Sequence, residues 1–461
     1  MHLICPVCGS AYEFNVYSKL CPRCGSPLFV MHSISPDTFK KVLLEARHRW
    51  NLGIWSFHEV LPTSSIGKTI GEAWTPIIKV ENFSRITGVE VLVKNESRNP
   101  SGTFIDRGTA VDSYIAYVNG FKDVVSASTG DYAISLSIYS KLYGLSTTHY
   151  IPIFIEQWKR YMLMVLGSKI IEVDSYSNAV RKAMRVSNKS SNFLSLSMSP
   201  TVIDGYRTIV FEVVDILKEI DWIAVPVGDG VLATSILKGL KEIEAYLEIE
   251  TPNILAVKLG EEDGAEQDFS KLFLTELGGG MLRDVLNKIL GEKGVFVAID
   301  KEAVYSTTNE IAYYDGLLVD PVGATSLAGI KKAVELGVID RGDRVLAIVS
   351  GSPSKDTYIL FKILEYGRRG TGGYPNLREG YMSEVQINIL KILYESRQIH
   401  LYEIWKRLQA MGHKITLQTV YSHVKKLLEK GYVRVLGVNG RRKIYSISEL
   451  GEEYLENMYS R

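Results

Sequence analysis

The sequence predicts an α/β protein with a parallel sheet covered by helices, preceded by a small metal-binding unit and followed by a separate helical domain. Three patterns predict this organisation. Apolar β-rich runs alternate with helical patterns between residues 40 and 370, all four cysteines lie within the first 24 residues, and the pattern changes after residue 383. A chain of 461 residues is long enough for several domains.

The composition is that of an ordinary globular chain, with 46% hydrophobic and 23% charged residues. No early stretch has the pattern of a signal peptide, and no apolar run reaches the ~20 residues of a membrane span. We therefore expect a soluble, cytoplasmic protein with no membrane partner. Residues 383–461 contain 13 Lys and Arg against 8 Asp and Glu, whereas the rest of the chain has 40 against 44. This asymmetry favours a polyanionic partner for the C-terminal segment.

Residues 1–30 are predicted to form a zinc ribbon. Cys5 and Cys8 make one Cys-x-x-Cys pair, and Cys21 and Cys24 make a second pair after a gap of twelve residues. Each pair can hold two thiolates on one tight turn, and two such turns make a tetrahedral zinc site. Four thiolates leave no open coordination position, so the expected zinc is structural. A redox role for one pair is the alternative.

Residues 31–370 are predicted to form the α/β body. Its apolar runs lie between helical patterns, as in a parallel sheet covered by helices. The clearest runs are Val89–Val93, Ile170–Val173, Ile223–Pro226, Ile254–Val257 and Val345–Val349. The Gly-rich stretch Tyr366–Gly380 is typical of a linker, and the linker itself is assigned to residues 371–382.

Residues 383–461 have the pattern of three helices and a hairpin. Ser383 can cap the first helix, and glycines follow the second and third. The expected elements are a helix from Glu384, a helix over Leu401–Met411, a helix after Thr416 up to Lys430, strands over Tyr432–Leu436 and Lys443–Ile447, and a closing helix over Glu449–Met458. This order resembles a winged helix-turn-helix domain.

In that resemblance the third helix is the recognition helix, and the hairpin is the wing. Polar side chains near a recognition helix start can reach base edges, and a basic wing tip suits phosphate or minor-groove contact. The candidates for DNA contact are Thr416, Gln418, Thr419, Tyr421, Ser422, Lys425, Arg441, Arg442 and Lys443. We expect His413 and His423 to be polar surface residues rather than metal ligands. The alternatives to DNA are a solvated basic face and a protein partner.

The segment Asn99–Gly108, N-P-S-G-T-F-I-D-R-G, resembles the N-P-T-G-S-F-K-D-R-G signature of threonine synthases. These are pyridoxal-phosphate (PLP) enzymes, and the resemblance covers most of residues 1–365, including the ribbon. It implies a two-subdomain body of PLP fold type II, similar to the tryptophan synthase β chain. In that family the lysine amine forms an imine with the cofactor. Ile105 stands at the lysine position and has no nucleophile, so no catalytic residue is assigned.

Three further segments resemble motifs of the same family. Ala127–Asp131 resembles the A-S-T-G-N loop that grips the substrate carboxylate, Pro226–Leu232 resembles the phosphate loop G-N-x-G-N, and Ser350–Asp356 resembles the T-G-x-G-x-K-D block. The resemblance places ligand-binding residues at Ser128, Thr129, Gly130, Asp131, Gly228, Asp229, Gly230 and Ser350.

Besides Ile105, three residues in these motifs differ from the family pattern in ways that disfavour PLP binding. Asp131 replaces an asparagine that contacts the cofactor's phenolic oxygen, so a donor becomes an acceptor. Asp229 brings a negative charge into the phosphate loop. Val231 adds bulk that restricts close backbone approach. Another lysine, such as Lys94 or Lys355, could serve instead, although neither is at the matching position.

The retained residues predict a different ligand. Ser128–Gly130 at a helix start can hold a carboxylate, since exposed N–H groups and the helix dipole favour an anion. Asp131 can hold an ammonium group. We therefore expect the body to bind an unmodified amino acid or a similar small carboxylate.

Together these patterns predict a DNA-binding transcriptional regulator, a homodimer by both resemblances, whose catalytically inactive body senses a small ligand. The alternative is a PLP-dependent, threonine-synthase-like lyase that converts phosphohomoserine to threonine, or another β-replacement enzyme, with an atypical lysine. A third interpretation is a structural subunit that partners an active paralogue.

Overall fold

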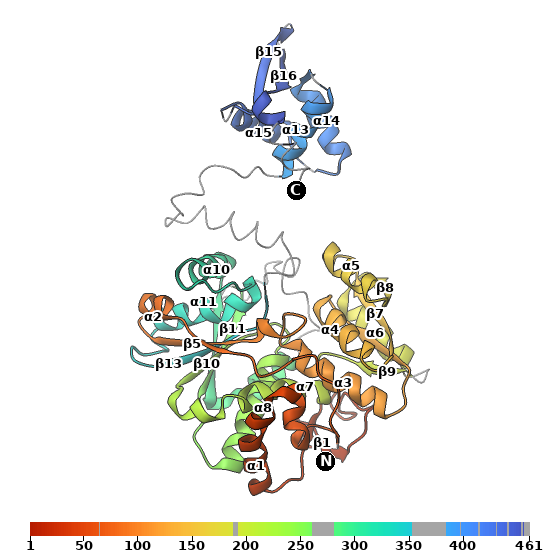
Figure 1. Ribbon diagram of the computed structural model, residues 1–461, viewed down its shortest axis with the longest axis vertical. Helices are drawn as coiled ribbons and strands as arrows, with labels where there is room; N and C mark the ends of the chain where they lie inside the picture. The colour runs from red at the N-terminus through yellow and green to blue at the C-terminus, as the bar shows by residue number, and fades with distance from the viewer. Residues whose placement is uncertain are drawn as a thin grey trace. The chain divides into compact units, whose positions relative to one another are not determined.

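The computed structural model describes residues 1–63, 65–187, 192–260, 281–352, 384–396, 398–413, 415–429, 431–439, 442–452 and 455. The chain divides into two compact units, Met1–Gly372 and Gly373–Arg461 (Figure 1). The predicted linker lies outside the described residues. Within the described ranges, no helix combines the length and the apolar character that a membrane span requires.

The chain begins with a small antiparallel sheet in the order β2-β1-β3. Its strands are β1 (His2–Ile4), β2 (Ala11–Glu13) and β3 (Phe29–Met31). Gly9 and Gly25 each follow the second cysteine of a pair, with φ of 72° and 77°. This left-handed conformation strains other residues, so both tight turns depend on glycine.

The larger sheet of the body has the order β12-β11-β10-β13-β5-β4. Its strands are β4 (Ile77–Lys79), β5 (Glu90–Asn95), β10 (Trp222–Pro226), β11 (Asn253–Leu259), β12 (Gly294–Ile299) and β13 (Arg344–Val349). All neighbours are parallel except β4, which runs antiparallel to β5. Four of the predicted apolar runs coincide with β5, β10, β11 and β13, which confirms them.

Helices cover both faces of this sheet. Because side chains alternate along a strand, Ile223 and Val225 pack into one apolar cluster, whereas Ala224 packs into another. The first cluster includes α1 (Pro36–Ala46), α7 (Pro200–Phe211), α8 (Val231–Leu247) and α9 (Met281–Leu290). The second includes α2 (Glu81–Thr87), α10 (Lys301–Asp315) and α11 (Pro321–Glu335) (Figure 1).

A second, fully parallel sheet has the order β8-β7-β6-β9. Its strands are β6 (Asp123–Ala127), β7 (Ser146–Pro152), β8 (Lys169–Val173) and β9 (Phe193–Ser195). The helices around it are α3 (Ile105–Val118), α4 (Asp131–Lys141), α5 (Gln157–Val165) and α6 (Tyr176–Ser187) (Figure 1). The body therefore has the two subdomains of PLP fold type II.

A buried ion cluster fixes the start of α3 in the body. Arg107 donates to Glu96 at 2.7 Å and is also paired with Glu212, which accepts from Lys94 at 2.6 Å. All four side chains are at most 1% exposed. Burial alone raises the pKa of Glu212, but the charges of Arg107 and Lys94 outweigh it and lower this pKa to about 2. The cluster holds the first turn of α3, and thus Ile105, in a defined position.

The C-terminal unit contains the predicted helices and hairpin. Its elements are α13 (Glu384–Ser396), β14 (Ile399–His400), α14 (Leu401–Ala410), α15 (Leu417–Glu429), β15 (Val433–Asn439) and β16 (Arg442–Ile447). The strands form an antiparallel sheet in the order β14-β16-β15. The sequence did not predict β14, since two residues are too few for a periodic pattern. Of the predicted closing helix, residues 449–452 are helical, and most of the rest lies outside the described residues.

Candidate functional site

One cavity of about 180 Å³ lies where strands of both sheets end. The loops after β6, β10 and β13 line it, together with the first residue of α3. Ligands of open α/β proteins bind at the carboxyl ends of parallel strands, because loops and helix starts meet there. Seven of the eight ligand-binding residues predicted from the sequence line the cavity, together with Ile105 and Val231. The eighth, Gly130, is not a lining residue, although its neighbours Thr129 and Asp131 are.

The loop from β6 to α4 forms one wall. The Ser128 hydroxyl accepts hydrogen bonds from the N–H groups of Gly130 at 2.9 Å and Ala133 at 3.1 Å, so it caps α4. Gly130 has a φ of 125°, and a β-carbon there would come within 2.2 Å of the Lys159 side chain. Glycine is therefore required at this position by both conformation and space.

Lys159, from α5, is a lining residue that no sequence motif indicated. Its ammonium lies 3.4 Å from the Asp131 carboxylate and 3.0 Å from that of Glu156, with the side chain 13% exposed. Burial alone lowers the pKa of Lys159, but the two carboxylates outweigh it and raise this pKa. The amine thus stays protonated at neutral pH, and Asp131 already holds an ammonium group.

The loop from β10 to α8 forms the facing wall. One oxygen of the Asp229 carboxylate accepts the Val231 N–H at 3.0 Å, and the other accepts the Ser197 hydroxyl at 3.3 Å. Gly230 has a φ of 88° and turns the chain into α8. The carboxylate of Asp229 therefore stands at the positive end of α8, where an anion is stabilised.

Ile105 and Ser350 complete the predicted set. Ile105 opens α3, donates its N–H to the Thr103 hydroxyl at 3.2 Å and lines the cavity with a half-buried side chain. Ser350 follows β13 and is 4% exposed. Its hydroxyl has no hydrogen-bond partner among the described residues. A buried hydroxyl without a partner is costly, so a ligand that bonds to Ser350 is favoured.

Three lining tyrosines also had no sequence signal: Tyr132, Tyr176 and Tyr206. Burial is the main cause that raises the pKa of each phenol, so all three stay neutral. The Tyr132 hydroxyl lies 2.7 Å from that of Ser195. These rings make much of the cavity wall aromatic.

Of the two alternative lysines, Lys94 lies within the described residues. Lys94 is buried in the ion cluster, donates to Thr75 O at 2.5 Å and does not line the cavity. Lys355 lies outside the described residues. Among the described lining residues, Lys159 is the one lysine.

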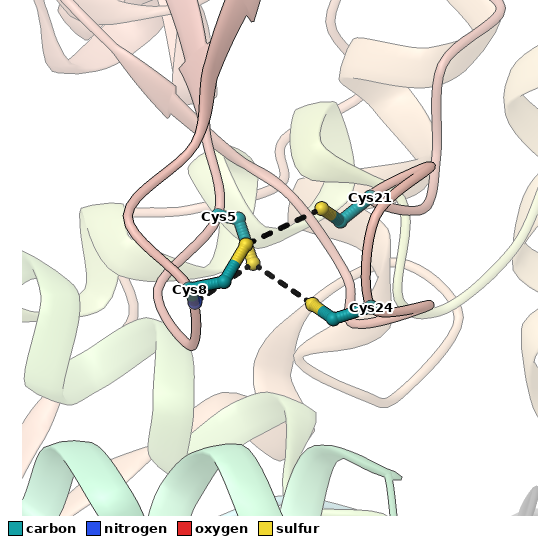
Figure 2. A group of neighbouring side chains, drawn as sticks. All are labelled: Cys5, Cys8, Cys21 and Cys24. Atoms are coloured by element: carbon teal, nitrogen blue, oxygen red, sulfur yellow. Dashed lines mark hydrogen bonds between the residues drawn. The ribbon is translucent and has the colours of Figure 1, made fainter.

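The four cysteines form a compact group, with their sulfurs all within 4.8 Å of one another (Figure 2). Cys5 Sγ lies 3.4 Å from Cys24 Sγ, and Cys8 Sγ lies 3.6 Å from Cys21 Sγ. Two turns that present four thiolates to a common centre can hold one tetrahedral zinc ion. Within the described ranges, no other group of three or more potential ligands is close enough for a metal.

In the C-terminal unit, α15 presents a polar face opposite its buried residues. Gln418, Tyr421, Ser422 and Lys425 are exposed and recur at helical spacing, whereas Val420, Val424 and Leu427 are buried. The second set is buried against α13 and α14, and the first set lies on the exposed face of α15.

The remaining predicted DNA contacts are placed less uniformly. Thr416 is exposed, but its hydroxyl accepts the Thr419 N–H at 3.2 Å and so caps α15. Thr419 is half-buried, and Lys443 is exposed on β16. Arg442 belongs to β16, while Arg441 lies outside the described residues.

Neither histidine near α15 belongs to a metal-binding group among the described residues. The His413 ring bonds to the Asn388 amide at 2.9 Å. Burial, followed by the charge of Lys426, lowers the pKa of His423.

Fold and cavity together define a PLP-enzyme-like body joined to a winged-helix unit, and comparisons with known proteins agree. Residues 68–351 match the pyridoxal-phosphate dependent enzyme family, and the chain belongs to that family. Residues 381–457 match the ferric uptake regulator family, a family of winged-helix regulators. The chain thus joins a PLP-enzyme-like domain to a regulator domain.

The chain is similar to threonine synthases. That of Methanocaldococcus jannaschii is 29% identical over 378 residues, covering 76% of this chain and 92% of the relative. That of Methanosarcina acetivorans is 27% identical over 385 residues, covering 79% and 94%. Among solved structures, processed threonine deaminase isoform 2 from Solanum lycopersicum has a TM-score of 0.54 at 19% identity, covering 74% of this chain and 91% of that one. This last likeness concerns the fold.

The family implies a PLP site, yet the lining residues fit that cofactor poorly. Ile105 offers no amine, and the one described lysine in the cavity is held by two carboxylates. The Asp229 carboxylate stands at the helix start that the resemblance assigns to the phosphate. Ser350, the counterpart of the residue that faces the pyridine nitrogen, is compatible with PLP.

Proposed function

We propose that the protein is a DNA-binding transcriptional regulator whose body binds a small ligand without PLP-dependent catalysis. One observation carries the proposal: a cavity lies at the carboxyl ends of the strands, and Ile105 lines it at the position where the family has an amine. A covalent step on the cofactor needs a nucleophile at that position. The exposed polar face of α15 supplies the other half of the function.

The ligand that the cavity suits is an unmodified amino acid or a related small molecule. The loop around Ser128–Gly130 offers backbone N–H groups and the start of α4, which attract a carboxylate. Because Asp131 is paired with Lys159 at 3.4 Å, the carboxylate of Asp229 is the acidic group proposed to attract the ligand's ammonium. Binding would change the separation of the two subdomains, and in a homodimer this would move the winged units on two DNA half-sites.

The four cysteines are proposed to hold a structural zinc ion. Cys5 and Cys21 are buried in the small apolar core of the ribbon, so a metal would replace a larger core in stabilising it. Since four thiolates fill the coordination sphere, the ion would take no part in chemistry.

Binding-site selection from a pool of genomic fragments tests the DNA-binding half, with the full-length protein as bait. We expect a small set of enriched sequences with inverted half-sites. Thermal unfolding with a panel of free amino acids tests the body, since a ligand that binds only the folded state raises the midpoint. No enriched sequence would contradict the first half, and an unchanged midpoint at millimolar concentrations would contradict the second.

The second candidate is a PLP-dependent lyase in which Lys159 replaces the missing lysine. The position of Lys159 in the cavity and the family membership of the chain favour this candidate. The two carboxylates beside Lys159 argue against it, because they stabilise the protonated, non-nucleophilic form of the amine. Incubation with PLP, borohydride reduction and peptide mapping decide the matter: an adduct on Lys159 would establish the lyase candidate, and its absence would exclude Lys159.

A further inference from the structure

The charges around the cavity do not suit a phosphate. Three acidic residues, Asp131, Asp229 and Asp320, and one basic residue, Lys159, are the charged side chains among the described lining residues. A ligand with a dianionic phosphate would lie close to these carboxylates in a partly desolvated space and be repelled by them, whereas a cationic amine would be attracted.

The position of Asp229 is more informative than its charge. Its carboxylate accepts the Val231 N–H at the first residue of α8 and the hydroxyl of Ser197. A helix start with free N–H groups binds a phosphate through these donors. Here the protein's own carboxylate has taken one of the donors and the positive end of the helix dipole.

A second residue of the cavity, Ser350, favours a bound ligand. The Ser350 side chain is 4% exposed and lines the cavity, and its hydroxyl has no partner among the described residues. A hydroxyl in such a place is stabilised when a bound molecule supplies a donor or acceptor. The cavity thus combines the Ser350 hydroxyl, which has no partner among the described residues, with a helix start at which the Asp229 carboxylate already binds.

We infer that Asp229 is a built-in substitute for a ligand phosphate, and that the cavity selects small molecules that carry a cationic amine and no phosphate. This inference rests on the proposed ligand-binding function and deepens it by naming the ligand class. It also accounts for the poor fit of PLP independently of Ile105. Asp229 acts here as a specificity-determining residue.

Pyridoxamine and pyridoxamine 5′-phosphate are suitable probes, because they differ only in the phosphate and have no aldehyde to react with surface lysines. Their affinities are measured by isothermal titration calorimetry on the full-length protein. We expect the unchanged protein to bind pyridoxamine at least as tightly as its phosphate ester. In Asp229→Asn, which keeps the acceptor for Val231, the affinity for the phosphate ester should rise by about tenfold or more.

Asp131→Asn is the matched control, since it removes the same charge from the facing wall, away from α8. It should change the affinity for the phosphate ester much less than Asp229→Asn does. Thermal unfolding verifies that each variant is folded, and Asp229→Ser replaces Asp229→Asn if that variant is not.

The inference is overturned if Asp229→Asn brings no gain in affinity for the phosphate ester, if Asp131→Asn brings an equal gain, or if the unchanged protein already prefers the ester. DNA is absent from these titrations. A failure of the proposed regulator function would appear only in the DNA selection, so the two failures can be told apart.

Discussion

At the scale of single residues, we propose that Ile105 and Asp229 separate this cavity from that of a PLP enzyme. Ile105 offers no amine to the cofactor, and the Asp229 carboxylate accepts the Val231 N–H at the start of α8, where the resemblance places the phosphate. Because each residue alone would prevent PLP chemistry, we expect that changing only one of them leaves the chemistry absent. Restoring the lysine alone should therefore not restore the chemistry.

The variant Ile105→Lys is expected to give no borohydride-reducible PLP adduct at residue 105 at PLP concentrations of about 10 to 100 µM. The reason is that Asp229 still repels the phosphate of the cofactor. The double variant Ile105→Lys with Asp229→Asn is expected to give the adduct. Absorbance, reduction and peptide mapping measure both. Ile105→Met, which adds length without an amine, is the control, and a saturable adduct in the single lysine variant would contradict the prediction.

At the scale of elements, the exposed face of α15 offers two kinds of DNA contact. Gln418 near the helix start suits a base edge, whereas Lys425 and Lys443 suit phosphates. Substituting both lysines by alanine should weaken binding to every sequence and reduce the magnitude of the salt slope by about 2. Gln418→Ala should instead cost about 1–3 kcal/mol on the preferred site and relax the base preference there.

Fluorescence anisotropy against a preferred and a scrambled duplex at several salt concentrations separates these effects. Glu403→Gln on α14 is a control, because it changes the charge of the same unit outside this face. Equal losses of affinity for both duplexes in the Gln418 variant would argue against base contact.

The ribbon is an element that should depend on its metal. One zinc ion per chain is expected by mass spectrometry of the native protein, and Cys8→Ser should lose it. Because the ribbon core is small, removal of the ion should expose its strands to proteolysis while the rest of the body resists. Ser10→Ala, beside Cys8 but with no thiolate, is the control; full zinc content in Cys8→Ser would contradict the assignment.

At the scale of the whole molecule, the two units should unfold separately, and the ion cluster should affect only the body. Glu212→Gln removes the carboxylate between Arg107 and Lys94 and leaves buried positive charge, which should destabilise the body by about 3–5 kcal/mol. Calorimetry should show the body transition shifted to lower temperature and the other transition unchanged. Loss of both transitions together would show that the units are coupled.

The same cluster sets a pH dependence. The pKa of Glu212 is lowered to about 2 from the ordinary 4.5, so the unfolded chain binds the proton more readily. The stabilisation from this group is therefore fully present above about pH 4.5 and disappears as the pH falls towards 2. Glu212→Gln should flatten the loss of body stability in that range, and an unchanged pH profile would contradict the role of the cluster.

Much of the molecule was predictable because its signals are local in the sequence. The buried strands are continuous apolar runs, the paired cysteines have fixed spacing, and the motif residues follow strands whose carboxyl ends meet at one place. Lys159 and the three tyrosines were not predictable, since only the packing of α4, α5, α6 and α7 brings them to the cavity. Likewise, the sequence predicted that Asp229 lies in a loop, but it could not predict that the carboxylate accepts a hydrogen bond from the Val231 N–H.

The most direct test of the proposed regulator is the affinity of the full-length protein for DNA fragments selected by it, compared with scrambled fragments at the same salt concentration. We predict dissociation constants of roughly 10⁻⁸ M or below for selected sites, at least about a thousandfold tighter than for scrambled ones. Equal affinity for selected and scrambled fragments, with a reducible PLP adduct on a cavity lysine, would contradict the regulator and favour the enzyme.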